Sequence, residues 1–282
     1  MSGFSALSSA ENHWATYMGA WFPGERVVYR GKDLFHELKH LSWMQLYLHG
    51  ITGRLFSEQQ AKLFEGMWTL CTSYPDPRLW NNRIGSLAGT VRSTGTLAIS
   101  AATAVSEASI YGRRPDILAI NFLIRAKSKL DQGINLQTIV EEELTTHRGI
   151  YGYGRPIVNK DERIIPLLNL AKQLDFADGP YTKIAFAVED ILLKGRWRMR
   201  MNVAALCAAL AADQDLNERE YYVLAMLCFS AGIVPCFIEA SQRPEATFLP
   251  LSCKHINYSG SPPRRWNPIE SKALADTSAK DC

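Results

Sequence analysis

Apolar residues recur at helical spacing along most of the chain, and one stretch, Tyr221 to Glu239, is apolar almost all the way round. A helix of that kind has to be buried on every side, which packed neighbouring helices provide. Alternation typical of strands is rare, and the clearest short strand pattern is residues 25–30, Glu-Arg-Val-Val-Tyr-Arg. The sequence therefore predicts an all-α fold.

Further segments carry helix signals. Ser57-Glu-Gln-Gln60 has the spacing of a capping box and predicts a helix through Met67. The acidic pair at 161–162 suits the start of a helix over 164–174. Residues 184–193 and 203–212 are apolar at the same spacing, and Pro235 is expected to interrupt the helix over 221–239. Loops are predicted at 73–80, 113–116, 149–163 and 259–268.

The composition is that of a folded, nearly neutral protein. Of the 282 residues, 47% are hydrophobic, which is enough for a sizeable core and excludes wholesale disorder. The net charge of +3 is small and dispersed, so we expect no nucleic-acid binding. We also expect no membrane span, because no run of 18 apolar residues occurs, and residues 1–11 show no secretory signal.

The cysteines and histidines do not predict a metal site. The six cysteines, at positions 71, 207, 228, 236, 253 and 282, form no CxxC pair, and four lie in apolar surroundings. This usage favours reduced, mostly buried thiols in a cytoplasmic protein. His36 and His40 are four residues apart, but leucines at 34, 38 and 41 make the segment look like an ordinary amphipathic helix.

The most unusual stretch is Gly152-Tyr-Gly-Arg-Pro156, which is followed by Asn159-Lys-Asp-Glu-Arg163. Two glycines let the backbone turn sharply or approach a ligand. Arg155, Lys160 and Arg163 would then meet an anion near a helix start. The alternative is an ordinary turn leading into a helix, and the spacing is not that of a phosphate loop.

Two other stretches carry possible chemistry. Ser106-Glu-Ala-Ser-Ile-Tyr-Gly-Arg-Arg-Pro115 is interpreted as a helix end with Gly112 as its C-cap, followed by either a carboxylate or phosphate clamp or a charged interdomain loop. Gly232-Ile-Val-Pro-Cys-Phe-Ile-Glu239 ends on one carboxylate. His147 and His255 are the histidines that would titrate near such sites.

The order of these segments resembles the citrate synthase superfamily, which includes 2-methylcitrate synthases and citryl-CoA lyases, over roughly residues 25 to 265. The segments that carry the resemblance are Val28-Tyr-Arg-Gly-Lys-Asp-Leu34, Leu46-Tyr-Leu-His-Gly50, Gly152-Tyr-Gly-Arg155, Asp161-Glu-Arg163, Met201-Asn-Val-Ala204, Gly232 to Glu239 and Asn257-Tyr-Ser-Gly260.

The resemblance implies a large helical domain of residues 1–112 and 223–282 and a smaller mobile helical domain of residues 113–222. The small, polar residues at the C-terminal end predict a disordered tail over 270–282. The resemblance also implies a homodimer, as do the apolar faces of 97–104, 203–212 and 221–239. An acyl-CoA and an oxo-acid would meet in the cleft. There a carboxylate base removes a proton, histidines stabilise the enol and polarise the carbonyl, and arginines hold carboxylates.

This chain departs from the family pattern at the catalytic positions. Tyr111 and Arg155 stand where the family has histidines, and Ala204 stands where it has the carboxylate base. A further histidine expected near Arg78 to Trp80 is missing, and Phe229 replaces an arginine. Arg163 is the carboxylate ligand that remains. Citrate synthesis by the usual three groups is therefore not expected.

The residues now found at and around these positions predict an altered active site. The predicted catalytic residues are Tyr111, Arg155 and Glu239, the predicted substrate ligands are Arg163, Arg78, Arg83, Asn202 and His147, and the predicted coenzyme A ligands are Lys160, Arg113 and Arg114. The missing base would be Glu239, Asp161, Glu162 or His147, or would be unnecessary in a lyase direction.

Two functions follow. The first is an enzyme that makes or breaks a carbon–carbon bond between an acyl-CoA and an oxo- or polycarboxylic acid, with no metal and no covalently bound cofactor. The alternative is a non-catalytic protein that binds an anionic metabolite or a partner protein.

Overall fold

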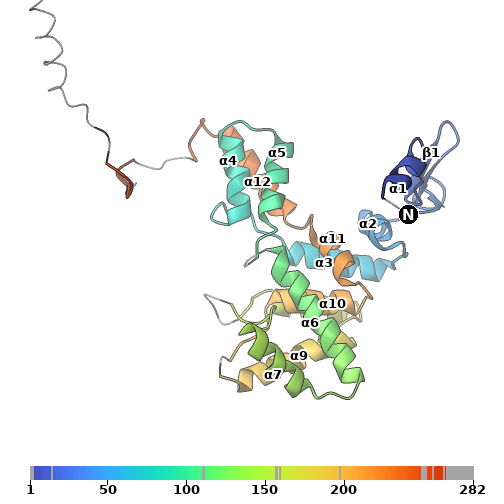
Figure 1. The fold of residues 1–282 in the computed structure, drawn as a ribbon, viewed down its shortest axis with the longest axis vertical. Coiled ribbons are helices and arrows are strands. Elements are labelled where there is room, and N and C mark those ends of the chain that lie inside the picture. The colour runs from blue at the N-terminus through green and yellow to red at the C-terminus, as the bar shows by residue number, and fades with distance from the viewer. Residues whose placement is uncertain are drawn as a thin grey trace, which may run out of the picture. The chain divides into compact units, whose positions relative to one another are not determined.

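The computed structural model describes residues 3–13, 15–109, 112–155, 158, 160–196, 198–248, 253–255, 257–262 and 264, with helices as the dominant element (Figure 1). The elements are α1 (Gly3–Ala10), β1 (Gly19–Phe22), β2 (Arg26–Tyr29), β3 (Lys32–Asp33), α2 (Trp43–Thr52), α3 (Glu58–Cys71), α4 (Trp80–Thr90), α5 (Gly95–Val105), α6 (Arg113–Asp131), α7 (Leu136–His147), α8 (Ile164–Gln173), α9 (Pro180–Lys194), α10 (Val203–Ala212), α11 (Glu218–Ala225), α12 (Ser230–Gln242) and the 3-10 turn Cys253–His255.

The chain divides into two units, residues 1–248 and residues 249–282. Every element from α1 through α12 belongs to the first unit, and the second contains the 3-10 turn. The expected tail over 270–282 lies outside the described residues. The expected boundaries at 112/113 and 222/223 stay predictions.

The strands form a small antiparallel sheet near the N-terminus. The strand pattern at 25–30 is confirmed as β2, which pairs with β1 from Gly19↔Tyr29 to Phe22↔Arg26 and with β3. The end of β2 is joined to α2, because the Arg30 guanidinium donates to the carbonyls of Gly50 and Ile51 at 3.0 Å each. These contacts use carbonyls at the end of α2 that have no partner within the helix.

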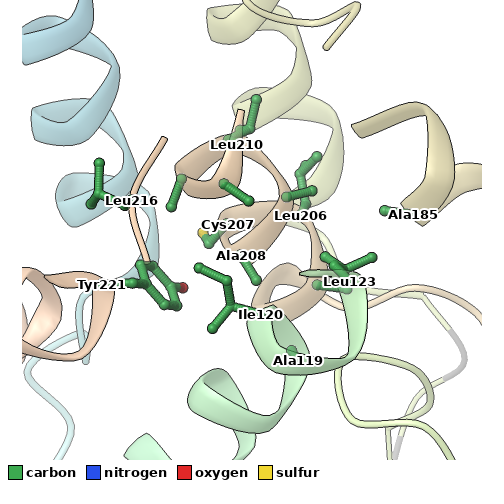
Figure 2. Packing of buried hydrophobic residues seen from close by; sticks show 14 of the residues in the cluster. Ala119, Ile120, Leu123, Ala185, Leu206, Cys207, Ala208, Leu210, Leu216 and Tyr221 are labelled. Atoms are coloured by element: carbon green, nitrogen blue, oxygen red, sulfur yellow. The ribbon is translucent and has the colours of Figure 1, made fainter. Parts of the chain in front are cut away.

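The core surrounds α10. Nine of its ten residues are buried, all but Ala204, and α6 and α9 pack against it. Figure 2 shows side chains of α10 among Ile120 and Leu123 of α6 and Tyr221 of α11. Alanines make up six of the ten residues, so the neighbouring helices approach the backbone closely. The apolar faces of 203–212 are therefore buried within this chain and do not support a dimer.

A second group of helices consists of α4, α5 and α12. Glycines let α4 approach α12, since a Cβ on Gly85 would lie 2.9 Å from the Ile233 carbonyl oxygen and one on Gly89 2.5 Å from that of Phe237. The Arg92 guanidinium then donates to carbonyls at the end of α12, at 2.7 Å from Ser241 and 2.7 Å from Arg243. Close packing and capping together fix this pair of helices.

The prediction of one helix over 221–239 is wrong, because the segment forms two helices. Between α11 and α12 the N–H groups of Met226, Cys228 and Ser230 bond to carbonyls three residues earlier instead of four. Side chains from elsewhere use the carbonyls near the break: Tyr47 Oη donates to Val223 at 2.9 Å, and Thr72 Oγ1 donates to Cys228 at 2.7 Å. Pro235 lies inside α12, so the interruption falls before the proline and not at it.

Among the described residues, the segment Glu218–Gln242 is long and apolar enough to cross a membrane by length and composition alone. Helices in the core of soluble proteins pass the same test. The expectation that the chain has no membrane span stays a prediction.

Other helix predictions are confirmed, and two are wrong. The capping box at Ser57 opens α3, and α8, α9 and α10 lie at the predicted places. Gly112, however, is the N-cap of α6 and not a C-cap, so the predicted loop at 113–116 is the first turn of that helix. The segment around His36 and His40 forms turns, which Asp33 stabilises by accepting from the N–H groups of Phe35 and His36.

Replacing Gly89 by alanine tests the close approach of α4 and α12. The added Cβ would also meet the Ala240 Cβ at 2.9 Å. Overpacking of this kind costs about 1–3 kcal/mol, whereas helix propensity returns about 1 kcal/mol at most. We expect a lower free energy of unfolding in urea. Gly149→Ala is the control, because its Cβ would meet nothing within 4 Å, and an equal change in the two variants would contradict the packing argument.

Candidate functional site

A cavity of about 1230 Å³ lies where several helix ends meet. Its wall comes from the end of α3, the loop over 72–80, the first turn of α6, the loop over 147–163, the start of α10 and the end of α11 with the break that follows. The sequence predicts site residues in four of these segments: Arg78 in the loop over 72–80, Arg113 at the start of α6, Arg155 and others in the loop over 147–163, and Asn202 at the start of α10. The cavity draws on both sides of the predicted domain boundaries.

The Gly-rich loop is fixed to the residues that precede α10. Gly152 and Gly154 have φ of +91° and +83°, which strongly favour glycine. A Cβ on Gly152 would lie 2.9 Å from the backbone nitrogen of Ala205, so the loop rests directly on α10. Asn202 N–H donates to the Gly152 carbonyl at 2.8 Å, and Asn202 Nδ2 donates to the Gly154 carbonyl at 2.9 Å.

Asn202 also caps α10, because its Oδ1 accepts from the Ala204 N–H at 3.0 Å. Both the Nδ2 and the Oδ1 atom of its side chain are therefore hydrogen-bonded to backbone groups. Asn202 lines the cavity, but as a structural clamp between the loop and the helix. Its predicted role as a substrate ligand stays untested.

Asp161 organises the positive charge on one wall of the cavity. Its side chain is fully buried and accepts from Arg163 Nε and Nη2 at 2.8 Å each, and from the Val203 N–H at 2.9 Å. Burial favours the neutral acid, but the hydrogen bonds from Arg163 and Val203 outweigh it and lower the pKa of Asp161. The carboxylate thus stays charged, holds Arg163 in place and satisfies the first turn of α10.

Arg155 lies beside this pair and is partly neutralised. Its Nη1 is 2.6 Å from a Glu162 oxygen and 3.7 Å from Asp161, and 27% of its side chain remains exposed. The backbone N–H of Glu162 and then the Arg155 guanidinium lower the pKa of the Glu162 carboxyl. Arg155 therefore faces the cavity as a cation with an exposed counter-ion.

The first turn of α6 brings another arginine–carboxylate pair to the cavity. Arg113 is 2% exposed, and its Nη1 lies 2.7 Å from Asp116 Oδ2. Its Nη2 donates to the Tyr222 carbonyl at 3.1 Å, and its Nε is buried without a hydrogen-bond partner. Burial raises the pKa of Asp116 even though Arg113 and Arg163 act to lower it.

Two thiols meet at the same wall. The Sγ atoms of Cys71, at the end of α3, and Cys207, in α10, are 3.3 Å apart, and both residues are free cysteines. The hydrogen bond with Cys71 and burial raise the pKa of Cys207 well above its ordinary value, so that thiol stays protonated. The prediction of mostly buried thiols is confirmed for Cys207, Cys228 and Cys236.

The structure brings six of the predicted site residues to the cavity: Arg78, Arg113, His147, Arg155, Arg163 and Asn202. Arg78 is 84% exposed and pairs with Asp76, while His147 lies 3.9 Å from Glu143. Four others do not line the cavity: Arg83, Arg114, Lys160 and Glu239. Glu239 instead pairs with Arg243 on α12, and Arg83 donates to the Pro77 carbonyl. Tyr111 and Pro156 lie outside the described residues.

Sequence reasoning missed three lining features. Asp116 follows Arg113 by three residues, which is about one helical turn. This spacing would have indicated an ion pair if the sequence had been predicted to form a helix there and not a loop. Trp68 presents a buried Nε1 without a hydrogen-bond partner. The thiols of Cys71 and Cys207 come together only through tertiary packing, so no sequence signal could have paired them.

The wall combines guanidinium groups, buried carboxylates and apolar surface. Such a site suits an anion that carries an apolar part, because the arginines orient carboxylates and the aromatic and aliphatic side chains cover the rest. Ala204 and Phe229, where the resemblance leads us to expect a carboxylate base and an arginine, both line the cavity.

Comparison with known proteins identifies the fold. The chain is similar to citryl-CoA lyase from Hydrogenobacter thermophilus, with a TM-score of 0.78, 21% identity, and coverage of 92% of this chain and 99% of that one. ATP citrate lyase from Methanothrix soehngenii, solved with citrate and coenzyme A, has a TM-score of 0.73 and 15% identity, with coverage of 93% of this chain and 45% of that one. Citrate synthase from Thermoplasma acidophilum, solved with carboxymethyl coenzyme A and oxaloacetate, has a TM-score of 0.61 and 19% identity, with coverage of 82% of this chain and 60% of that one.

No family model matches the sequence, and no curated protein matches it. The chain spans nearly the whole of the citryl-CoA lyase, under half of the ATP citrate lyase and about three fifths of the citrate synthase. The predicted all-α fold of the citrate synthase superfamily is confirmed.

Replacing Asp161 by asparagine tests its role as the organiser of this wall. Because its folded-state pKa is lowered, the carboxylate stabilises the fold above the unfolded pKa of about 3.9 and loses that effect as pH falls through the folded-state value. We expect Asp161→Asn to lower the free energy of unfolding by about 1–3 kcal/mol at pH 7. The difference from wild type should vanish at acid pH.

Asp76→Asn is the matched control for that experiment. Asp76 also accepts from the arginine two residues later, at 2.5 Å from Arg78 Nη2, but Arg78 is 84% exposed. Solvent screens such a pair, so we expect a smaller loss than for Asp161→Asn. Equal losses in chemical denaturation would show that burial of Asp161 is not what matters.

Proposed function

We propose that this chain makes or breaks a carbon–carbon bond between an acyl-CoA and an oxo- or polycarboxylic acid, using altered active-site residues. The observation that carries the proposal is the arginine-lined cavity in a chain with the citrate synthase fold. The similarity covers 92% of this chain and 99% of a citryl-CoA lyase, which supports this class of reaction.

The polycarboxylate is the part of the substrate that the wall supports best. Asp161 occupies Nε and Nη2 of Arg163, and within the described residues no hydrogen bond uses Nη1, which can meet a ligand. Arg155 lines the same cavity with a 73% exposed counter-ion, Glu162, that a carboxylate can replace. Arg78 also lines it, and 84% of its side chain is exposed. Charge-assisted hydrogen bonds to guanidinium groups are the usual means of fixing such anions.

Coenzyme A is proposed as the carrier of the acyl group. Of the three residues predicted to bind it, Arg113 lines the cavity but is buried and paired with Asp116. Arg114 and Lys160 do not line the cavity, so their role would require contacts outside it. The two neighbouring folds solved with coenzyme A or carboxymethyl coenzyme A support this choice of carrier.

A second function has an observation of its own. Ala204 faces the cavity where the resemblance places a carboxylate base, and alanine cannot take a proton. This favours a non-catalytic protein that binds an anionic metabolite or a partner protein. Both functions fit the expected cytoplasmic setting without a covalently bound cofactor.

Calorimetry with acetyl-CoA, free coenzyme A, oxaloacetate and citrate distinguishes the two. We expect wild type to bind a coenzyme A species and a carboxylate, and Arg155→Ala to weaken citrate binding by about 2–4 kcal/mol, because one partner of a charged pair is removed. Arg219→Ala is the control, since Arg219 is exposed on α11 and does not line the cavity. Arg155→His should not restore citrate synthesis, because Ala204 still leaves no base at the position where the resemblance expects it.

The outcomes separate the hypotheses. If no coenzyme A species binds while citrate does, the enzyme proposal fails and the binding protein remains. If Arg155→Ala binds citrate as tightly as wild type, the Gly-rich loop is structural and the position of the ligand is wrong. Citrate formation by Arg155→His would show that a base acts in this cavity already.

We also propose a homodimer formed through the group of α4, α5 and α12. Within this group Leu97, Val91 and Ile238 are 63%, 59% and 45% exposed, although neighbouring faces of the same helices are tightly packed. Exposed apolar side chains gathered on one group of helices are typical of an interface.

Light scattering tests the dimer. We expect a mass of about twice 31.6 kDa for wild type, and a shift towards the monomer for Leu97→Glu, because a charge would be buried in the interface. Ile165→Glu is the control, since Ile165 is 70% exposed on α8. A monomer mass for wild type over a wide range of concentrations would contradict the proposal.

A further inference from the structure

The proposed function leaves a proton to be moved without the usual carboxylate, so the acidic groups of the cavity are the place to search. Among the described residues, the carboxylates that line it are Asp116, Asp161 and Glu162. Glu239, a candidate from the sequence, does not line it and pairs with Arg243. The imidazole of His147 does line it, with Glu143 at 3.9 Å.

Two of these carboxylates are poorly suited to accept a proton. Asp161 is held by two nitrogens of Arg163 and by the Val203 N–H, and these bonds lower its pKa. Glu162 is 73% exposed and bound to Arg155, and its pKa is lowered as well. A base with a lowered pKa has little driving force to remove a proton from carbon.

Asp116 differs from both in how its oxygens are used. It lies in the first turn of α6, lines the cavity and keeps 21% of its side chain exposed. Its Oδ2 is 2.7 Å from Arg113 Nη1, whereas no hydrogen bond to Oδ1 is made by any part of the chain that the structure describes. One oxygen is therefore anchored, and the other is available to a ligand.

The anchor itself is rigid. Arg113 is 2% exposed, donates to the Tyr222 carbonyl at 3.1 Å, and has its Cζ 5.8 Å from the ring centroids of Tyr221 and Tyr222. A guanidinium held in this way fixes the direction of the carboxylate that it binds. A catalytic group has to be held within a fraction of an ångström, and this arrangement supplies that positioning.

The groups that face Asp116 come from several elements. They are Arg113 on α6, Arg163 before α8, Cys207 on α10, Tyr221 on α11, and Cys228 in the break after α11. Burial raises the pKa of Cys228 to about 12. The hydrogen bond with Cys71 and burial raise the pKa of Cys207, and burial raises that of Tyr221, so both stay protonated. At pH 7, Asp116 therefore faces two cations and three neutral groups in an apolar setting.

We propose that Asp116 is the general base of this site, which exchanges a proton with the α-carbon of the acyl thioester. This rests on the function proposed above. In synthesis, Oδ1 takes the proton, the C–H bonding pair becomes the enolate double bond, and the thioester oxygen gains the negative charge. The enolate carbon then adds to the carbonyl carbon of the oxo-acid, and the protonated Asp116 gives its proton to the new alkoxide. In cleavage, Asp116 takes the proton of the substrate hydroxyl, the carbon–carbon bonding pair forms the same enolate as the carbonyl re-forms, and Asp116 returns the proton to the α-carbon. No oxidant or further reactant is needed.

The balance of forces at Asp116 suits this step. Burial raises its pKa, which makes it a stronger base than an exposed carboxylate, and Arg113 keeps the charged form populated. The guanidinium groups on the same cavity are placed to offset the charge that develops on the thioester oxygen.

Deuterium exchange tests the proposal directly. Acetyl-CoA is incubated in D2O with and without oxaloacetate, and its methyl deuterium content is measured by mass spectrometry. We expect Asp116→Asn to slow exchange by at least about 100-fold, with acetyl-CoA affinity within about 3-fold of wild type. Asp131→Asn is the matched control, since Asp131 pairs with Lys127 at the other end of α6 and is 61% exposed.

A second variant covers the case in which Arg113 without its partner prevents folding. Asp116→Glu keeps the charge but moves the carboxylate by one methylene group, and we expect slowed exchange with a displaced pH profile. If its rate and pH profile both match those of wild type, Asp116 is not the base.

The failures are distinguishable. Wild-type exchange that persists undiminished in Asp116→Asn would overturn the assignment of the base and leave the proposed function standing. Wild-type protein that binds acetyl-CoA without any exchange, with or without oxaloacetate, would overturn both and favour the non-catalytic protein.

Discussion

The burial of α10 is the constraint from which the site follows. The first N–H groups of a helix have no acceptor within the helix, so a helix with nine of ten residues buried needs acceptors for them from elsewhere in the chain. The first turn of α10, where these groups lie, faces the cavity. Asn202 accepts from Ala204 N–H, and Asp161 accepts from Val203 N–H. Asp161, which satisfies the Val203 N–H of the core helix, therefore also positions Arg163. The stability of the fold and the proposed binding of an anion thus depend on the same carboxylate.

The sequence predicted the fold well because its strongest signals are local. The capping box at Ser57 and the apolar spacing of 203–212 depend on residues within one or two turns, and both are confirmed. The break after α11 was not predictable in this way, since its carbonyls accept hydrogen bonds from Tyr47 and Thr72, which lie far away in the sequence. Tertiary hydrogen bonds can end a helix that its own sequence would continue.

The site was predictable where a motif fixes the backbone and not where packing assembles it. Gly152 and Gly154 do adopt positive φ, and the loop that they form does line the cavity. Gly112 was assigned to the wrong helix end, because a glycine between two helical patterns suits either a C-cap or a close approach. A Cβ there would lie 2.2 Å from the Ser106 carbonyl oxygen, which only the folded chain reveals. The C-cap prediction places Asp116 in a loop, so the sequence gives no reason to expect a base there.

The charges of the cavity are arranged differently from what a count of arginines suggests. Four arginines that line the cavity have a carboxylate beside them, at 2.5 Å for Arg78, 2.6 Å for Arg155, 2.7 Å for Arg113 and 2.8 Å for Arg163. Arg148 also lines it and forms no ion pair within the described part of the chain. Most of the positive charge on the wall is therefore paired.

These pairs fall into two kinds. Those of Arg78 and Arg155 are solvated on at least one side, so exchanging their carboxylate for that of a ligand costs little. Those of Arg113 and Arg163 include a nearly or fully buried partner, and breaking them would leave a charge without compensation. An anionic ligand is therefore expected to displace the carboxylate of a solvated pair and to leave the buried pairs intact. On this division, the two pairs with a buried partner set the geometry of the cavity, and the two solvated pairs keep its cations compensated until a ligand takes the place of the carboxylate.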